Sequence, residues 1–178
     1  MIRRIVTSHL NGKSVVVNEG APPVAHVFQH IPGMEFALAW ATPSRPEIAA
    51  GGEAEAVSSA TSVIPRQGET RLLFLKVPPD SIATRPGFDP AAAGQEFAAH
   101  NGEIAATMEQ DHPGMHRTDS IDYVIVLEGE IHMELDDQQE VLLKQHDVVI
   151  QNGTRHAWRN KSDRTASLAV VLVGAQRR

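Results

Sequence analysis

The sequence predicts a mainly β protein, built as an antiparallel sandwich or barrel with one or two short helices. Many short runs of β-branched and apolar residues follow one another in the second half of the chain, separated by tight turns. Only residues 89–110 have the pattern of a helical region. The length of 178 residues suits one domain with a sizeable core, so we expect residues 1–178 to fold together.

The first part of the chain is expected to supply strands to the same barrel and then an irregular connection. Asn11-Gly12 is a strong two-residue turn signal between two β-rich runs, which predicts a hairpin. Residues 42–69 are rich in Pro, Gly, Ala, Ser and Glu, which is typical of a long irregular connection. The strands expected in this part are residues 2–6, 14–17, 24–30 and 36–41, with Trp40 packed inward.

The middle of the chain combines one strand with the helical region. Residues 70–77 (TRLLFLKV) predict a strand because they are apolar and bounded by turn formers. Asp89 can cap the helix that follows, and Pro90 suits its first turn. Gly94 and the Asn101-Gly102 pair weaken the helical pattern, so two short helices are expected rather than one.

From residue 115 onward the chain is expected to consist of strands joined by short turns. The links contain turn-forming pairs such as Asn152-Gly153. Short links join antiparallel neighbours, which is why this part predicts a sandwich or barrel. The expected strands are residues 115–128, 130–135, 140–144, 147–151, 155–159 and 166–173.

Composition and charge narrow the classes of partner. The formal net charge of -6 argues against a nucleic-acid-binding surface. The chain has no cysteine, so any metal must be bound by His, Asp, Glu or backbone oxygen. The start, MIRRIVTSHL, lacks the apolar region of a secretory signal, and no apolar run approaches the ~20 residues of a membrane span. We therefore expect a cytoplasmic protein with no nucleic-acid and no membrane partner.

The segment GMHRTDSIDYVIVLEG (residues 114–129) places polar residues at even spacing along an apolar, β-branched run. Alternate side chains of a strand share a face, so His116, Thr118 and Asp122 should point toward one interior. His156 follows a later turn and belongs to another expected strand. Two imidazoles and one carboxylate from separate strands can bind a metal ion and leave positions open for water and substrate.

Each of these residues also has a purely structural interpretation. His116 and His156 could be buried histidines bonded to backbone groups, and Asp122 could form an ion pair or orient His116. We favour metal ligation for all three because they fall in register with one another. An unpaired buried carboxylate is costly, so Asp122 needs some partner in either case.

The same alternation predicts what surrounds the metal. Thr118 is expected to line the pocket and to bond the substrate or a metal-bound water. Val124, Val126 and Trp158 are expected to form its apolar walls. His112 is expected in a loop at the barrel mouth, where it could act as a general acid or base rather than supply a fourth ligand.

These residues resemble the two sequence motifs of the cupin superfamily. The matching residues are His116, Thr118, Asp122 and Gly129 in the first motif, and Gly153, His156 and Asn160 in the second. The resemblance covers roughly residues 70–175 and implies a double-stranded β-helix, or jelly-roll barrel. Residues 1–69 would then form an N-terminal β extension and a connection within the same single domain.

The chain departs from the family pattern at the metal ligands. Thr118 stands where the second His of the first motif usually lies, and Asp122 stands where a Glu usually lies. The resemblance therefore implies three ligands, His116, Asp122 and His156, in place of four. The implied cofactor is a divalent metal ion such as Zn, Fe, Mn or Ni.

The expected site and the resemblance favour a metal-dependent enzyme that acts on a small organic molecule. Open coordination positions suit non-redox chemistry of the lyase, decarboxylase, dehydratase or isomerase type. A ferrous ion at the same site would instead suit a dioxygenase. A small-ligand-binding or structural cupin without catalysis is the alternative from a different class, since fold alone does not fix function.

A homodimer is the expected assembly. Ile121, Tyr123, Ile125 and Leu127 alternate with the inward residues and form an apolar row on the outside of the barrel. Such a row needs a cover, and proteins that resemble this one are commonly dimers. We therefore expect a second copy of the chain as partner.

Overall fold

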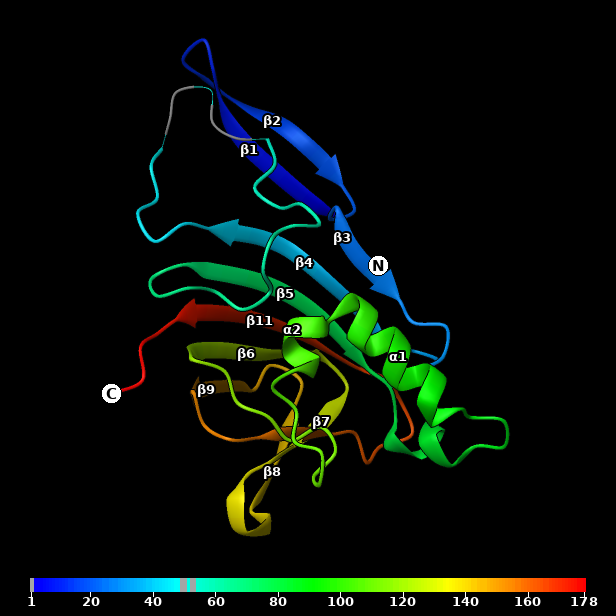
Figure 1. Ribbon diagram of the computed structural model, residues 1–178. Helices are drawn as coiled ribbons and strands as arrows, with labels where there is room; N and C mark the ends of the chain where they lie inside the picture. The colour runs from blue at the N-terminus through cyan, green and yellow to red at the C-terminus, as the bar shows by residue number, and fades with distance from the viewer. Residues whose placement is uncertain (1, 49–50, 52–53) are drawn as a thin grey trace.

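The computed structural model describes residues 2–48, 51 and 54–178. Within these residues the strands form three antiparallel sheets, the α-helices are short and lie within residues 90–105, and a 3₁₀ turn, η2 (Asp136–Gln138), follows β7 (Glu130–Glu134) (Figure 1). This mainly β, antiparallel architecture confirms the predicted fold class. None of the helices in the described ranges has the length and apolar character that crossing a membrane would need.

In the described part of the chain the largest sheet has six strands, ordered β3-β4-β5-β11-β6-β9. Its centre is β11, which pairs with β5 on one side and β6 on the other over almost its whole length. Every pairing in this sheet is antiparallel. The strands are β3 (Val24–Val27), β4 (Glu35–Thr42), β5 (Thr70–Val77), β6 (Ser120–Glu128), β9 (Val148–Asn152) and β11 (Ala166–Gly174).

A smaller sheet, ordered β10-β7-β8, supplies the other part of the barrel. Its strands are β7 (Glu130–Glu134), β8 (Glu140–Lys144) and β10 (Ala157–Arg159). Ile131, Met133 and Leu143 of this sheet belong to the same buried cluster as Leu168 and Val170 of β11. The core therefore lies between the two sheets, as the alternation of apolar residues along each strand requires.

The N-terminal hairpin forms as predicted but makes a sheet of its own. β1 (Arg4–Leu10) and β2 (Lys13–Gly20) join at Asn11 and Gly12, whose φ angles of 52° and 75° suit the turn that Asn-Gly favours. The hairpin lies beyond β3 and β4 at one end of the molecule (Figure 1). The expectation that all N-terminal strands join the barrel is thus wrong for β1 and β2. These strands bury few apolar side chains, of which Val6 belongs to the buried core.

The helical region also follows the prediction. The Asp89 carboxylate accepts hydrogen bonds from the backbone N–H groups of Ala91 and Ala92, and it caps α1 (Pro90–His100). α2 (Gly102–Ala105) follows after Asn101, and a short 3₁₀ turn, η1 (Asp80–Thr84), precedes both. Phe97 and Ile104 pack against the buried cluster, so this segment covers part of the core.

The strand predicted over residues 115–128 is too long at its start, because β6 begins only at Ser120. The carbonyls of Thr118 and Asp119 accept hydrogen bonds from Arg177 and from the N–H of Ala175, both in the C-terminal segment. The backbone here is therefore bonded to the tail of the chain rather than to a strand. His116 is held instead by an isolated β-bridge to His156.

Candidate metal centre

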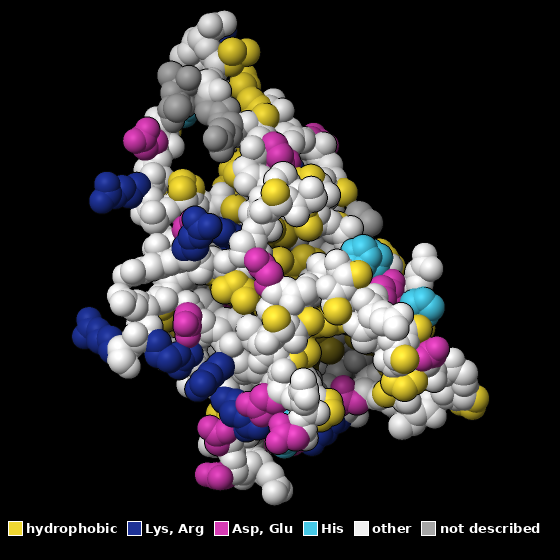
Figure 2. Space-filling view, viewed as in Figure 1, with side chains coloured by type: hydrophobic (Ala, Val, Ile, Leu, Met, Phe, Trp, Pro, Cys, Tyr) yellow, Lys and Arg dark blue, Asp and Glu magenta, His cyan; other side chains and the backbone are white. Residues whose placement is uncertain are grey.

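A cavity of about 220 Å³ lies between the sheets and the helical segment. Figure 2 shows hydrophobic side chains gathered over the centre of this face of the molecule. The cavity wall is largely apolar and carries a few polar side chains, which is the usual character of a small-molecule site. Those polar residues are Lys76, Asn101, His116, Thr118, Asp122 and His156.

The two histidines are held beside each other by their own backbones. The N–H of His116 donates to the carbonyl of His156, and the N–H of His156 donates to the carbonyl of His116, each at 2.9 Å. The ring centroids are 4.5 Å apart, with the ring planes at 47°. Two imidazoles from segments forty residues apart thus meet on one wall of the cavity.

Hydrogen bonds fix the tautomer of both rings. Nδ1 of His116 lies 2.9 Å from the carbonyl of Gly114, and Nδ1 of His156 lies 3.0 Å from the carbonyl of Thr154. A carbonyl only accepts, so both Nδ1 atoms carry the proton and donate it. The Nε2 lone pairs remain free for a ligand, as in most metal-binding histidines.

Burial keeps both imidazoles neutral. Desolvation lowers the pKa of His116 below its ordinary value. Desolvation, with repulsion from His116 as a second cause, lowers the pKa of His156 to about 4. Neutral rings with free Nε2 lone pairs are the form that binds metal ions.

Asp122 is the third polar residue of this wall and the least satisfied. It is only 6% exposed, and its Oδ1 atom is buried without a hydrogen-bond partner. Burial raises the pKa of its carboxyl to about 6, and a hydrogen bond with Ser120 offsets part of that effect. A buried carboxylate in this state gains from either a proton or a cation.

The side chains of His116, His156 and Asp122 are of the types that bind a divalent metal. The two histidines are close enough together to share one ion, whereas Asp122 is not. Imidazole nitrogen and carboxylate oxygen suit Zn, Fe, Mn and Ni, and the partnerless Asp122 Oδ1 is the kind of atom that a cation would satisfy. In residues 2–48, 51 and 54–178, however, no three His, Asp or Glu side chains lie close enough together to form a metal-binding group. The imidazole pair is assembled, and Asp122 lines the same cavity apart from it.

The other predicted site residues divide between the wall and its surroundings. Thr118, Val124 and Trp158 line the cavity, and the Trp158 ring meets the His156 ring edge-on at 5.5 Å. Thr118 Oγ1 is hydrogen-bonded to Ser120 Oγ at 2.8 Å. Val126 does not line the cavity, because it is fully buried in the core two residues further along β6.

His112 lies outside the cavity wall. Its Nε2 is 3.0 Å from Oε1 of Glu134, and Glu134 Oε2 accepts from Nε of Arg159 at 2.6 Å. Arg159 in turn donates to the carbonyl of Pro113. These contacts tie the loop before His116 to β7 and β10, and they direct His112 toward Glu134.

The sequence did not predict that helical residues would line the cavity. Phe97, Asn101, Ile104 and Met108 all line it. Their spacing of four, three and four residues is the period of one helical face, which is the signal that could have found them. Nothing in the sequence indicated that this face would line the same cavity as the two histidines.

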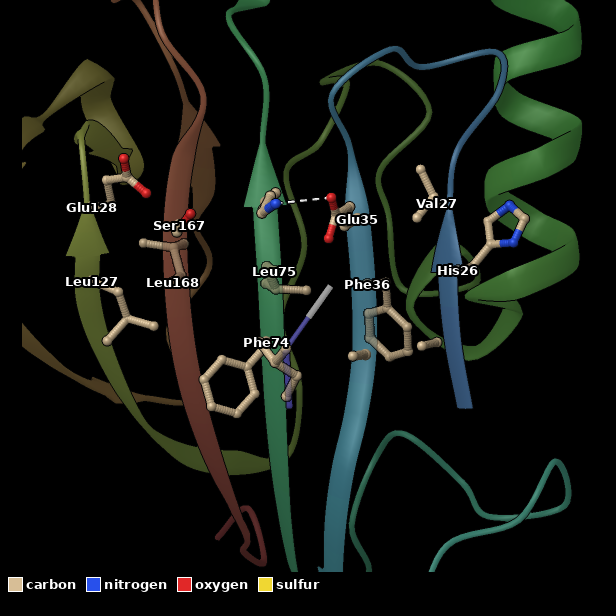
Figure 3. Close-up of a pocket in the computed structure, with 14 residues that line it drawn as sticks. His26, Val27, Glu35, Phe36, Phe74, Leu75, Leu127, Glu128, Ser167 and Leu168 are labelled. Carbon is tan, nitrogen blue, oxygen red and sulfur yellow. Dashed lines mark hydrogen bonds and ion pairs between the residues drawn. The ribbon is translucent and has the colours of Figure 1, made fainter. Parts of the chain in front are cut away.

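A second cavity, of about 250 Å³, lies along the large sheet and shares Phe36, Leu75 and Lys76 with the first (Figure 3). Side chains of β3, β4, β5, β6 and β11 line it, and an ion pair of 2.8 Å joins Lys76 to Glu35. Its histidine, His26, is bonded through Nε2 to Glu96. The described lining residues include no second imidazole, so this cavity is a weaker candidate for metal chemistry.

Comparison with known proteins supports the resemblance seen in the motifs. Residues 103–173 match the family model of the cupin domain. Phomopsin biosynthesis cluster protein C' of Diaporthe leptostromiformis is 56% identical over 48 residues, which are 27% of this chain and 25% of that protein. A cupin-domain-containing oxidoreductase, virC, of Hypocrea virens is 36% identical over 64 residues, 34% of this chain and 33% of that protein. The matched region thus spans a third or less of either relative.

Solved structures give a more distant likeness. A cupin-2 domain containing protein from Shewanella frigidimarina aligns with 57% of this chain and 68% of its own, at 14% identity and a TM-score of 0.35. The family match, together with the barrel and the two motif segments, confirms the family that the sequence resembles.

Proposed function

This chain belongs to the cupin superfamily, and we propose that it is a metal-dependent enzyme acting on a small, largely apolar organic molecule. We propose that His116, His156 and Asp122 hold the metal, within a single domain of residues 1–178 whose barrel spans 70–175. The observation that carries the proposal is the pair of neutral imidazoles with free Nε2 atoms on the wall that also holds the partnerless Asp122 oxygen.

A bound divalent ion would supply a Lewis acid and lower the pKa of a water molecule. The protein supplies the rest. The carbonyls of Gly114 and Thr154 hold the rings in one tautomer, and the backbone bridge fixes their separation. Asp122 is the group whose burial favours either a proton or a positive partner, so it can balance the charge of the centre. These properties support non-redox lyase, decarboxylase, dehydratase or isomerase chemistry.

The cavity limits the size and polarity of the substrate. Its volume of about 220 Å³ falls below the roughly 300–1,000 Å³ of pockets for drug-sized ligands. Met34, Phe36, Phe97 and Trp158 are among its walls, so much of the substrate must be apolar. The two histidines and Asp122 are among the polar residues of the wall, and we propose that the reacting group of the substrate lies near them.

An iron-dependent oxidoreductase is the second candidate. The observation that favours it is the relative virC, which is named an oxidoreductase and matches this chain over 64 residues. Two imidazoles and one carboxylate would leave room at a ferrous ion for dioxygen as well as substrate. Oxygen uptake that depends on added ferrous iron would favour this candidate over non-redox chemistry.

Metal content tests the proposal directly. We would purify the protein without chelator or nickel affinity and measure bound metals by elemental mass spectrometry. The wild type should hold about one metal per chain, and His116→Ala/His156→Ala should hold little. His9→Ala/His30→Ala is the matched control, since it removes two exposed histidines. If the wild type takes up no metal after reconstitution, a barrel that binds a small ligand without a metal explains the structure better than a metal-dependent enzyme.

We also propose that two copies of the chain associate. Ile121, Tyr123 and Leu127 of β6 are exposed, and so are Val148 and Ile150 of the neighbouring edge strand β9. A sheet face with this many exposed apolar side chains is typical of an interface. Light scattering should give the mass of a dimer, and a Tyr123→Asp variant should be monomeric. A wild type with the mass of one chain would contradict this assembly.

A further inference from the structure

We propose that Asn101 binds the substrate of the central cavity by accepting a hydrogen bond from a hydroxyl or N–H group of that molecule. The inference rests on the proposed function in one respect, namely that the cavity is the substrate site. The inference goes beyond the proposed function because it adds a second polar contact point, on the helical wall of the cavity. This second contact point defines a class of substrate. That class has a hydrogen-bond donor joined by an apolar body to the group that reaches the histidines.

The position of Asn101 makes it part of the cavity. It lies between α1 and α2, it is only 3% exposed, and it lines the cavity with Phe97 and Ile104. Its Oδ1 atom is buried and has no hydrogen-bond partner. Buried amide oxygens in proteins nearly always have a partner, so one without it at a cavity wall calls for a partner from the cavity.

The usual structural reason for an Asn at this place does not apply. An Asn before a helix normally accepts from the helix N–H groups, but the Asn101 side chain makes no capping hydrogen bond. Its backbone supplies the connections instead, donating to the carbonyl of Phe97 and accepting from Ala105, each at 2.8 Å. Its φ of −132° is open to any residue, so the backbone does not require Asn either.

The rest of the wall shows why Asn101 stands out. Lys76 is paired with Glu35, and the Thr118 hydroxyl is bonded to Ser120. Among the described wall residues, the side-chain polar atoms without a hydrogen bond include the two imidazole Nε2 atoms, Asp122 Oδ1 and Asn101 Oδ1. Three of these belong to the barrel wall, and Asn101 belongs to the helical wall. A molecule that satisfies both must be polar at two places and apolar between them.

The test uses two matched series of probes on the full chain. One series is the straight-chain alkanoates from four to eight carbons, and the other is the same acids with a terminal hydroxyl. Binding is measured by calorimetry on the metal-free and the zinc-loaded protein. We expect that at one chain length the hydroxyl acid binds about three- to ten-fold more tightly than the alkanoate. Asn101→Leu, which keeps the size and removes the acceptor, should abolish that preference.

One further variant and one comparison separate the possible causes. Phe97→Leu alters the same wall without touching the amide, so it should weaken both series alike and keep the hydroxyl preference. The metal-free wild type should show the same hydroxyl preference as the zinc-loaded protein, so a failure of the metal centre and a failure of this inference give different results.

Two results would overturn the inference. One is the absence of a hydroxyl preference at every chain length in the wild type, whether or not the alkanoates bind. The other is a hydroxyl preference that Asn101→Leu retains. Thermal unfolding adds an independent readout: Asn101→Leu should unfold at the same or a higher temperature, because it removes an unsatisfied buried atom. A lower unfolding temperature without loss of preference would assign Asn101 a structural role.

Discussion

Two pairs of neighbouring histidines occur in the part of the chain that the structure describes, and they differ in ring geometry and in hydrogen bonding. His26 and His100 stack with their ring centroids 3.4 Å apart and their planes at 10°, and His26 is bonded to the Glu96 carboxylate. His116 and His156 lie 4.5 Å apart at 47°, and each donates from Nδ1 to a carbonyl. The first pair joins α1 to β3, whereas the second keeps its Nε2 atoms for a ligand.

Proximity alone does not make two imidazoles suitable for binding one metal ion. Stacked rings present their faces to each other, so their nitrogen lone pairs diverge. Tilted rings whose Nδ1 atoms are already occupied can direct both Nε2 atoms at a common point. The hydrogen-bond partner of the other ring nitrogen is therefore a better guide than ring distance to which pair is available for a metal.

The largest expected effect is a loss of zinc affinity when a histidine of the second pair is replaced, with no such loss for the first pair. His116→Ala should weaken zinc binding by at least about 100-fold, since a direct ligand should cost more than the 10- to 100-fold typical of its outer partners. His26→Ala should leave the affinity unchanged and lower the free energy of unfolding by about 1 kcal/mol, because it removes the stacked contact. Competition with a zinc-binding dye and urea unfolding measure the two effects. Equal loss of affinity in both variants would refute the distinction.

The buried carboxylate of Asp122 should lower the free energy of unfolding of the metal-free protein. Its pKa of about 6 lies above its usual value near 3.8, so the folded state binds more protons than the unfolded state between these values. Stability contributed by the protonated group is then lost as the pH rises from about 4 to 6. Asp122→Asn should therefore stabilise the chelator-treated protein by about 3 kcal/mol at pH 8, with a smaller gain at pH 4. Urea unfolding at both pH values measures the gain, and a uniform loss would contradict it.

His156 should have the opposite pH dependence. Its pKa of about 4 lies below its usual value of 6.5, so the unfolded state binds more protons in that window. Its contribution to stability therefore rises with pH from about 4 to 6.5. Burial also lowers the pKa of His116, so its contribution to stability rises with pH as well. Asp122→Asn removes the opposing slope and should steepen the rise of stability with pH. The metal-free His156→Gln variant should show a shallower rise than the wild type, and identical profiles for the two variants would argue against these shifts.

The smallest effect concerns the attachment of α1 by the other histidine pair. The Glu96 carboxylate accepts hydrogen bonds from the backbone N–H groups of Gln29 and His30 and lies 2.9 Å from Nε2 of His26. Glu96→Gln places an amide donor against those N–H groups. Hydrogen exchange at Gln29 and His30 should accelerate while zinc affinity stays unchanged. Glu128→Gln, at an exposed carboxylate, is the control and should change neither.

The sequence predicted most of the barrel because each strand carries its own signal. Thr70–Val77 and Glu140–Lys144 are strands with the predicted bounds, and Asp89 caps α1 as expected. The sequence also predicted that His116, Asp122 and His156 would share one interior, and all three line one cavity. Local alternation of apolar and polar residues was sufficient for these features.

The features that the sequence did not predict depend on contacts between distant segments. The start of β6 is set by the C-terminal segment, where Ala175 bonds Asp119, and no local pattern reports that contact. His26 meets His100 across more than seventy residues. The helical wall around Asn101 has a visible period, but only the packing of α1 and α2 decides that this face closes the cavity.

The reciprocal bridge between His116 and His156 has a consequence for engineering the site. The two positions are joined through main-chain atoms, so their separation is independent of the side chains that they carry. Antiparallel residues bonded in this way have Cα atoms about 5.5 Å apart. Other pairs of side chains can therefore be placed at positions 116 and 156 without changing the distance between the two main chains. At the proposed metal centre, replacing both histidines together should change the preferred ion while the barrel stays the same.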